Sequence, residues 1–259
     1  QSFIGSTTQI IGTQTFNLAN GINETVIAAP SYFTFQSSDP SIVSVDDLGL
    51  VTVRETGTAE ITAILGGVRA DGSLTIESLG DFTPAPTPNR AAANVISIFS
   101  DQYNNVPVDF YNGFFFPNQT TLGGAGLVIN GDNIIRYTNL NFVASEFKNP
   151  TVNASEMTHF HVDIQIENSV NTGDFVTVEL GDFGADRAFG GGDDSSGRVT
   201  ITADALSSRT WISLDIPLAD FGLSSRANLA QIFFITDGTA TNLPGTITDI
   251  LVDNMYFYK

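Results

Sequence analysis

Aromatic side chains crowd one stretch of the chain, residues 94–117, which reads NVISIFSDQYNNVPVDFYNGFFFP. Its first residues alternate as in a buried strand, and the rest is rich in the turn formers Asn, Pro and Gly. Rings in such a loop either pack into a core or face a flat apolar partner. Two interpretations follow: a plug at one end of a sandwich, or a platform for the C–H faces of sugar rings. The platform residues would be Tyr103, Phe110, Tyr111, Phe114 and Phe115.

A glycine-rich segment, residues 181–197, offers a second set of groups that suit a sugar. A few polar side chains beside aromatic rings fix the orientation of a small ligand. The glycines at 190–192 predict a flexible connection, because a phosphate-binding loop needs a strand before it and a helix after it. We expect sugar contacts from Phe183, Arg187, Phe189 and Asp193. Alternatively, the aspartates of this segment hold a cation: Asp186, Asp193 and Asp194.

Two further runs are predicted strands with one polar face. Residues 159–167, HFHVDIQIE, place His161 and Asp163 on the face opposite the apolar residues. Such a stripe is most often solvated, and the two side chains become hydroxyl partners if it lines a site. In TWISLDI, Trp211 shares a face with polar residues, so its ring either meets a ligand or covers a sandwich edge. The His-x-His spacing fits zinc, but the sequence shows no convincing third ligand.

Composition narrows the classes of partner. The formal net charge of −18 and the pI near 4.1 argue against nucleic acid, anionic membranes and polyanionic glycans, and they favour a neutral partner. The same charge alternatively serves solubility alone. The absence of cysteine excludes disulfides and thiolate sites, and no apolar run is long enough to span a membrane. The start at Gln1 without a signal peptide predicts a mature or trimmed chain.

Catalysis is not expected. A glycosidase needs two carboxylates about 5–10 Å apart across the scissile bond. The Glu-x-Asp-x-x-Glu strand of jelly-roll β-glucanases is absent, and both histidines lie in one strand, which leaves no Ser-His-Asp arrangement. We therefore expect a protein that is not an enzyme.

Short alternating runs broken by Gly, Pro and Asp fill the whole chain, which predicts an all-β protein. Alternating prolines at 84, 86 and 88 predict a semi-rigid linker. We therefore expect a β-sandwich domain over 1–80, a linker over 81–90, and a β-jelly-roll sandwich over 91–259. Short helical turns are expected at 203–206 and 228–230.

Residues 37–67, SSDPSIVSVDDLGLVTVRETGTAEITAILGG, resemble the bacterial Ig-like group 2 family. The shared features are a Ser-Asp-Pro turn, a Val-Asp-x-x-Gly-x-Val hairpin and a Gly-Thr-Ala-x-Ile-Thr strand. The resemblance implies an Ig-like spacer or adhesion domain without a site of its own.

The second domain resembles carbohydrate-binding modules of laminarin-utilisation systems in marine Bacteroidota. The resemblance rests on residues 94–113 and on the phrases MTHFHVDIQIEN, LGDFGADRAFGGGDDSS, TWISLDIPLADF and DILVDNMYFYK. Several relatives carry tryptophans where this chain has Phe110, Tyr111, Phe114 and Phe115. The resemblance implies a jelly roll that binds β-1,3-glucan, in a protein secreted by a bacterium or held on its outer-membrane surface.

Jelly rolls that resemble this one often bind one structural Ca²⁺ between the first and the last strand. The resemblance therefore implies a calcium site at Asp101 and Asp253, although Asp253 alternatively faces solvent or caps a turn. We expect a non-catalytic protein that captures laminarin, with other modules of a glycan-uptake system as possible partners. The alternative is a structural or adhesion protein that recognises proteins and has no glycan site.

Overall fold

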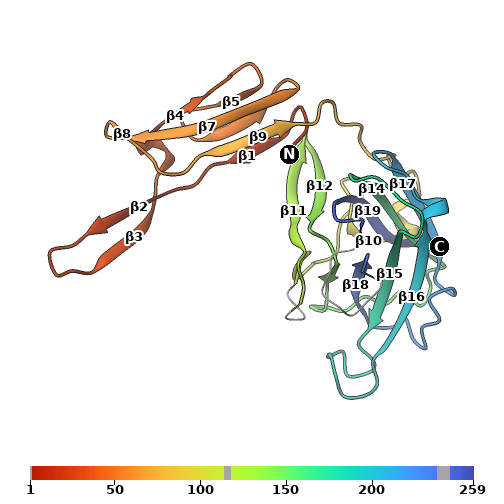
Figure 1. The fold of residues 1–259 in the computed structure, drawn as a ribbon. Helices are drawn as coiled ribbons and strands as arrows, with labels where there is room; N and C mark the ends of the chain where they lie inside the picture. The colour runs from red at the N-terminus through yellow and green to blue at the C-terminus, as the bar shows by residue number, and fades with distance from the viewer. Residues whose placement is uncertain (1, 114–117, 238–245) are drawn as a thin grey trace. The chain divides into compact units, whose positions relative to one another are not determined.

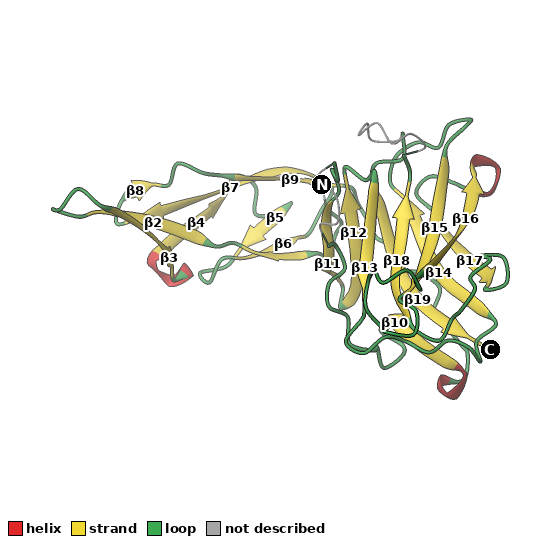
Figure 2. Ribbon diagram, turned by 90° about the horizontal axis from the view of Figure 1, so that it is seen from below, coloured by secondary structure: helices red, strands yellow, loops and turns green. Residues whose placement is uncertain are grey.

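The structure is a computed structural model that describes residues 2–113, 118–237 and 246–259. Strands make up nearly all of its regular structure (Figures 1 and 2). The helices in the described residues are three single turns: Pro30–Tyr32 (η1), Ala92–Asn94 (η2) and Ala203–Ala205 (η3). The prediction of an all-β protein is confirmed.

Contacts divide the chain into two compact units. The first contains the residues up to Pro84 together with Leu127–Asp132, and the second contains Ala85–Gly126 and Asn133–Lys259. Most of the segment expected to be a linker, from Ala85 onward, therefore belongs to the second unit. The reason is that residues 85–94 lie on a sheet of that unit, as described below.

The first unit is built from short strands in three sheets. One sheet has the order β1-β6-β5, a second joins β4, β7, β8 and β9, and the third is the hairpin β2–β3. Its small core contains Val43, Val51 and Ile61, whose neighbours along the strands are less buried. The strands are Thr7–Gln9 (β1), Gly12–Asn17 (β2), Asn23–Ala28 (β3), Phe33–Ser37 (β4), Val43–Val45 (β5), Leu50–Val53 (β6), Gly57–Leu65 (β7), Val68–Arg69 (β8) and Leu74–Ser78 (β9).

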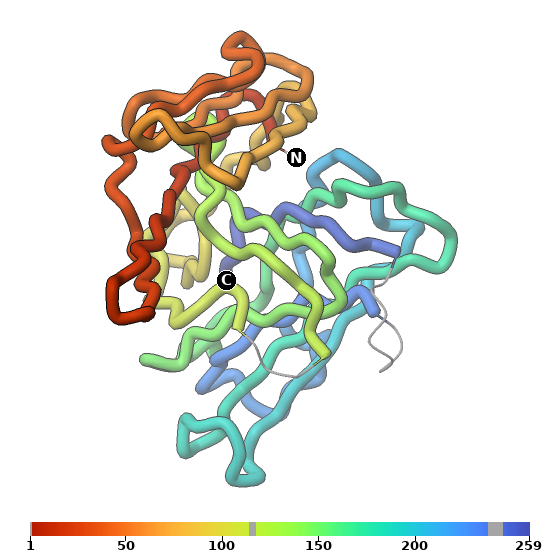
Figure 3. Tube along the Cα trace, turned by 60° about the vertical axis from the view of Figure 1, so that its left-hand side comes forward, coloured from red at the N-terminus to blue at the C-terminus, as the bar shows by residue number. Residues whose placement is uncertain are grey.

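The β2–β3 hairpin extends away from the other strands of its unit (Figures 1 and 3). Its strands pair only with each other among the described residues. A two-stranded ribbon is marginally stable by itself, and this one exposes several large apolar side chains: Phe16, Leu18, Ile22, Val26 and Ile27.

The second unit is a sandwich of two antiparallel sheets. The six-stranded sheet has the order β11-β12-β19-β14-β17, with β10 also paired to β19, and the four-stranded sheet has the order β13-β18-β15-β16. The strands are Val95–Phe99 (β10), Leu122–Ile129 (β11), Asp132–Thr138 (β12), Phe142–Glu146 (β13), His159–Ile166 (β14), Phe175–Asp182 (β15), Ser195–Thr202 (β16), Trp211–Pro217 (β17), Leu229–Ile235 (β18) and Ile250–Tyr258 (β19).

Alternate residues of both sheets meet in one apolar core. Phe160, Val162 and Ile164 of β14 point inward, as do Ile232 and Phe234 of β18, and all are fully buried. The opposite residues of each strand therefore face outward, and these outer faces hold the polar side chains. The turn expected at 203–206 is present as η3, whereas residues 229–230 belong to β18, because Leu229 and Ala230 are needed in its buried ladder.

Candidate functional site

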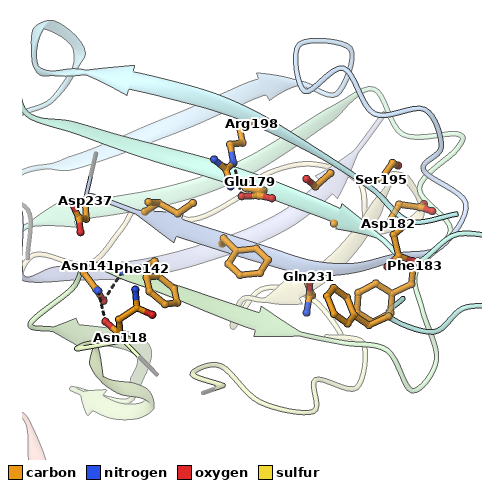
Figure 4. Close-up of a pocket in the computed structure, with 16 residues that line it drawn as sticks. Asn118, Asn141, Phe142, Glu179, Asp182, Phe183, Ser195, Arg198, Gln231 and Asp237 are labelled. Atoms are coloured by element: carbon orange, nitrogen blue, oxygen red, sulfur yellow. Dashed lines mark hydrogen bonds and ion pairs between the residues drawn. The ribbon is translucent and has the colours of Figure 1, made fainter. Parts of the chain in front are cut away.

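The outer face of the four-stranded sheet carries a groove with a volume of about 650 Å³. The side chains that line it come from all four strands and from the loop after β15 (Figure 4). Its floor combines apolar and polar groups, as sites for small polar ligands do. The principal lining residues are Phe142, Glu179, Gly181, Phe183, Phe189, Arg198, Gln231, Phe233 and Asp237.

Strand register sets the order of groups across the floor. Phe233 of β18 is the Cα partner of Glu179 of β15, and Glu179 is the partner of Arg198 of β16. Since residues in register point to the same side of a sheet, an aromatic ring, a carboxylate and a guanidinium lie in one row. Phe142 of β13 lies diagonally beside Phe233, because its own partner is Ile235. The groove therefore has two aromatic rings on one side and an ion pair on the other.

The groove floor has a depression next to this row, further along β15 and β18. The next row across the sheet contains Gln231 and Gly181, which are Cα partners. Because Gly181 has no side chain, the floor is lowered between Gln231 and the end of the groove formed by Phe183. A Cβ at Gly181 would lie 3.3 Å from Oε1 of Gln231, so the space there is narrow. Gln231 itself is held by a hydrogen bond from its Nε2 to Glu146.

The loop between β15 and β16 closes that end of the groove, and Figure 1 shows it extending beyond the two strands. Asp182, which is buried, fixes the start of the loop by accepting hydrogen bonds from the backbone N–H groups of Gly184 and Asn228. Phe189 is 79% exposed and packs against the buried ring of Phe183 at a centroid distance of 5.8 Å. The loop thus presents an exposed ring on a fixed base.

The three aspartates of this loop lie together. One carboxylate oxygen from each of Asp186, Asp193 and Asp194 lies within 4.8 Å of the others. All three also accept hydrogen bonds from backbone amides of the loop, for example Asp193 from Ala185 at 2.6 Å and Asp194 from Gly190 at 2.7 Å. These bonds explain how a loop with so many glycines keeps its shape.

Of the residues expected from the sequence to contact sugar, the groove contains Phe183 and Phe189. Asp193 and Arg187 lie in the same loop and are exposed, but they are not lining residues. Phe114 and Phe115 lie outside the described residues. The sequence analysis missed Phe142, Phe233, Glu179 and Arg198. The alternation of β15 and β18 was a usable signal, since it places Glu179 and Phe233 opposite the core residues.

The aromatic loop of residues 94–117 contributes to packing in its described part. Tyr111 donates its hydroxyl to the carbonyl of Ile98 at 3.0 Å, packs edge-on against Phe99, and has its pKa raised to about 12 by burial. Phe110 bridges to Glu146 at the edge of β13. Tyr103 packs against Tyr256, and its hydroxyl bonds the backbone of Arg90. None of these three residues lines the groove.

The polar stripe of β14 is buried rather than solvated. His161 is 8% exposed and Asp163 is fully buried. Residues 85–94 and the neighbouring strands account for this burial. Asn254, which hydrogen-bonds Asp163 at 2.9 Å, also donates to the carbonyl of Pro86, and the guanidinium of Arg90 lies 3.4 Å above the ring of Tyr258. Trp211, at the start of the edge strand β17, is half-buried on the six-stranded sheet and does not line the groove of the four-stranded sheet.

The two aspartates expected to bind calcium have separate surroundings. Asp101 is exposed and accepts hydrogen bonds from the backbone and the side chain of Asn133. Asp253 is 4% exposed and accepts one from the backbone of Asn254. The calcium site stays a prediction.

Comparison with family models gives a match for one part of the chain. Residues 12–76 match the family model of the bacterial Ig-like domain (group 2). This match confirms the resemblance predicted for the first unit. No curated protein matches the chain.

Several solved structures share a likeness of fold. The family 30 carbohydrate-binding module of a cellulosomal cellulase of Clostridium thermocellum has a TM-score of 0.43 and 14% identity over 64% of this chain and 97% of its own. The family 11 module of the same organism, in complex with a β-1,3-1,4-mixed-linked tetrasaccharide, has a TM-score of 0.35 and 17% identity over 60% and 97%. SGBP-B from a xyloglucan utilization locus in Bacteroides uniformis has a TM-score of 0.35 and 10% identity over 100% and 72%.

Proposed function

We propose that the second unit binds a neutral polysaccharide along the groove, without cleaving it. The observation that carries the proposal is the row formed by Phe233, Glu179 and Arg198 on the groove floor. An aromatic ring takes the C–H face of a pyranose, and the carboxylate and guanidinium beside it take hydroxyl groups. Gln231 and Ile235 of β18 both line the groove, and a strand rise of about 3.4 Å per residue makes this interval about 14 Å long, enough for more than one sugar ring.

The ligand of this proposal is a β-1,3-glucan of the laminarin type. The resemblance of the second domain to laminarin-binding modules supports this choice, and the net charge of −18 supports a neutral ligand over an anionic one. The proposed location is outside the bacterial cell, secreted or on the outer-membrane surface, alongside other modules of a glycan-uptake system. No helix among the described residues is long and apolar enough to cross a membrane.

Two glutamates support binding over hydrolysis: Glu179, which lines the groove, and Glu146, which accepts a hydrogen bond from the lining residue Gln231. Glu179 accepts a hydrogen bond from Nε of Arg198 at 2.6 Å, and Glu146 pairs with Lys148 at 2.6 Å and with Gln231 at 2.8 Å. A glycosidase needs one carboxylic acid that gives up a proton and a second carboxylate that attacks or activates water. Both glutamates are instead held in polar pairs, which suits fixed hydrogen-bond acceptors.

The test is calorimetric titration of the full chain with laminarin, comparing the wild type with Phe233→Ala. Aromatic anchors of binding sites contribute about 2 kcal/mol or more, so we expect Kd to rise about 30-fold. Trp211→Phe is the control, because Trp211 is half-buried on the six-stranded sheet. The Kd of this variant for laminarin should equal that of the wild type.

A wild type that binds no neutral glucan would contradict the proposal and favour the structural or adhesion alternative. Loss of affinity in Trp211→Phe with Phe233→Ala unchanged would place the site on the six-stranded sheet instead. Release of reducing sugar from laminarin would contradict the non-catalytic part of the proposal.

A further inference from the structure

Among the described residues that line the groove, Arg198 is the one basic residue. Its side chain is 65% exposed, whereas that of its partner Glu179 is 10% exposed. An exposed arginine normally samples many rotamers, and this freedom is lost when it orders on a ligand. Here the guanidinium is already held, because its Nε donates to Oε2 of Glu179 at 2.6 Å.

This single hydrogen bond leaves most of the guanidinium available. Among the described residues, neither Nη atom of Arg198 makes a hydrogen bond or ion pair, so up to four N–H donors face solvent in one plane. Glu179 in turn keeps Oε1 as an acceptor. Figure 4 shows the two side chains together on neighbouring strands of the groove floor. The pair therefore presents a planar fork of donors with an acceptor beside it.

Phe233 fixes how a sugar meets this fork. A pyranose that stacks on the Phe233 ring has its mean plane roughly parallel to the ring, and its equatorial hydroxyls then project sideways. Because Glu179 and Arg198 follow Phe233 in the same row, hydroxyls on that edge of the sugar point toward the ion pair. Two adjacent equatorial hydroxyls match a planar fork, which donates two parallel hydrogen bonds. A lysine has no such fork and acts as a point charge.

We infer that Arg198 is a specificity-determining residue that reads two adjacent, free, equatorial hydroxyls of one pyranose ring, with Glu179 as its positioning residue. This inference rests on the proposed function, and it narrows the ligand. Every internal ring of a β-1,4-glucan has such a pair at positions 2 and 3. In a β-1,3-glucan the 3-oxygen is in the linkage, so the pair at positions 2 and 3 occurs only on the non-reducing terminal ring and on β-1,6-linked branch rings, and one of these rings of laminarin would stack on Phe233. In a β-1,4-mannan the 2-hydroxyl is axial, so the internal rings lack the pair and only the non-reducing terminal ring offers one, at positions 3 and 4.

The experiment titrates the full-length wild type, R198K and the control R209K with laminarin, cellohexaose and mannohexaose. Arg209 is an exposed arginine outside the groove, and the same exchange there should leave every Kd within about twofold. R198K should raise the Kd of the glucans that the wild type binds by about tenfold or more, the loss expected for one charge-assisted hydrogen bond. The wild type should prefer cellohexaose to mannohexaose, and R198K should lose this preference.

Thermal unfolding of R198K should match that of the wild type, since the side chain is exposed. A Kd for R198K within about twofold of the wild type on the glucans it binds would overturn the inference, and so would a preference for cellohexaose that survives the exchange. A wild type that binds none of the three glycans is a different result, because it contradicts the proposed function itself.

Discussion

At the scale of single residues, Gly181 decides the depth of the groove. Its neighbours in register are Gln231 on β18 and Ser196 on β16, so any side chain there would stand on the floor. Its backbone φ is not in the left-handed region, which means that the chain tolerates other residues at this position. The glycine is therefore needed for space and not for conformation.

We expect Gly181→Leu to block binding while the protein stays folded. The new side chain would fill the depression between Gln231 and Phe183 and displace the ligand, raising the Kd for laminarin about 100-fold or more, as the loss of a central contact does. Gly181→Ala is the matched control, because its methyl group would lie 3.3 Å from Oε1 and 3.4 Å from Cβ of Gln231, which a small shift relieves, and should raise Kd by less than about threefold. Calorimetry gives both values, and equal affinities for all three proteins would show that the ligand avoids this depression.

Gly197 shows the opposite case on the next strand. A Cβ there would lie 1.9 Å from the backbone oxygen of Phe221, which cannot move aside as a flexible side chain does. The same residue type thus creates space in the groove at 181 and for the backbone of a neighbouring segment at 197. Only the surrounding structure distinguishes these roles.

At the scale of elements, the buried polar side chains of β14 connect this strand to β17, to β19 and to the segment of residues 85–94. His161 stacks on Tyr256 of β19 at a centroid distance of 4.5 Å, and its Nδ1 lies 2.9 Å from Oδ1 of Asp215 on β17. Its Nε2 lies 3.5 Å from Oδ2 of Asp163 on its own strand. Arg90, from the segment of residues 85–94 that covers the sheet, forms an ion pair with Asp215 at 3.9 Å.

This arrangement predicts that stability falls as the pH rises through neutrality. Burial by itself lowers the pKa of His161, but the hydrogen bonds and charges of Asp163 and Asp215 outweigh it, so the pKa is raised above 6.5. A raised pKa in the folded state gives stability that is fully present below the unfolded value and is lost as pH rises through the folded one. We expect the free energy of unfolding to decrease from about pH 6.5 upward.

Urea unfolding between about pH 5.5 and pH 9 measures this dependence. His161→Gln should remove it, and His159→Gln, at the only other histidine, should keep it. The carboxyl of Asp215 does not contribute to the pH dependence of the free energy of unfolding in this range. Burial raises its pKa, but the hydrogen bonds from His161 and Tyr258 and the nearby charges lower it below 3.8, so its own contribution is lost only in acid. A slope that persists in His161→Gln would contradict the assignment.

The predicted calcium site also concerns the elements, because an ion there would connect the end of β10 to β19. If an ion binds at Asp101 and Asp253, it stabilises the folded state in proportion to its concentration over Kd, by about 2.7 kcal/mol at 100 times Kd. Added Ca²⁺ should then raise Tm and EDTA should lower it, and Asp253→Asn should remove the difference. Asp193→Asn is the control. A response that is lost only in Asp193→Asn would assign the ion to the loop of Asp186, Asp193 and Asp194 instead.

At the scale of the whole molecule, the net charge of −18 acts on stability and not on a neutral ligand. Like charges repel in the compact state, and salt screens that repulsion. Raising the ionic strength from about 10 mM to about 1 M shortens the Debye length from about 30 Å to about 3 Å. We expect Tm to rise over this range while the Kd for laminarin changes by less than about twofold, which calorimetry and thermal melts can follow in parallel. A Kd that changes strongly with salt would indicate a charged ligand.

The sequence alone determined the all-β class, the Ig-like stretch and the strands that became β14 and β17 of the second unit. Alternation and turn residues are local signals, so residues 159–167 were predicted as a strand, and β14 forms there over His159–Ile166. The core of β14 followed in the same way, because Phe160, Val162 and Ile164 share one face.

Only the tertiary structure decided which side chains become neighbours on the outward face of a sheet, and what covers that face. Glu179, Phe233 and Arg198 are far apart in the chain, and their row depends on the register of β15 with β16 and β18. The same limit applies to the polar stripe of β14, which is buried because residues 85–94 lie on its sheet. Strand pairing and coverage by a distant segment are long-range contacts. A local pattern says that one face of a strand is polar, but it does not say what lies against that face.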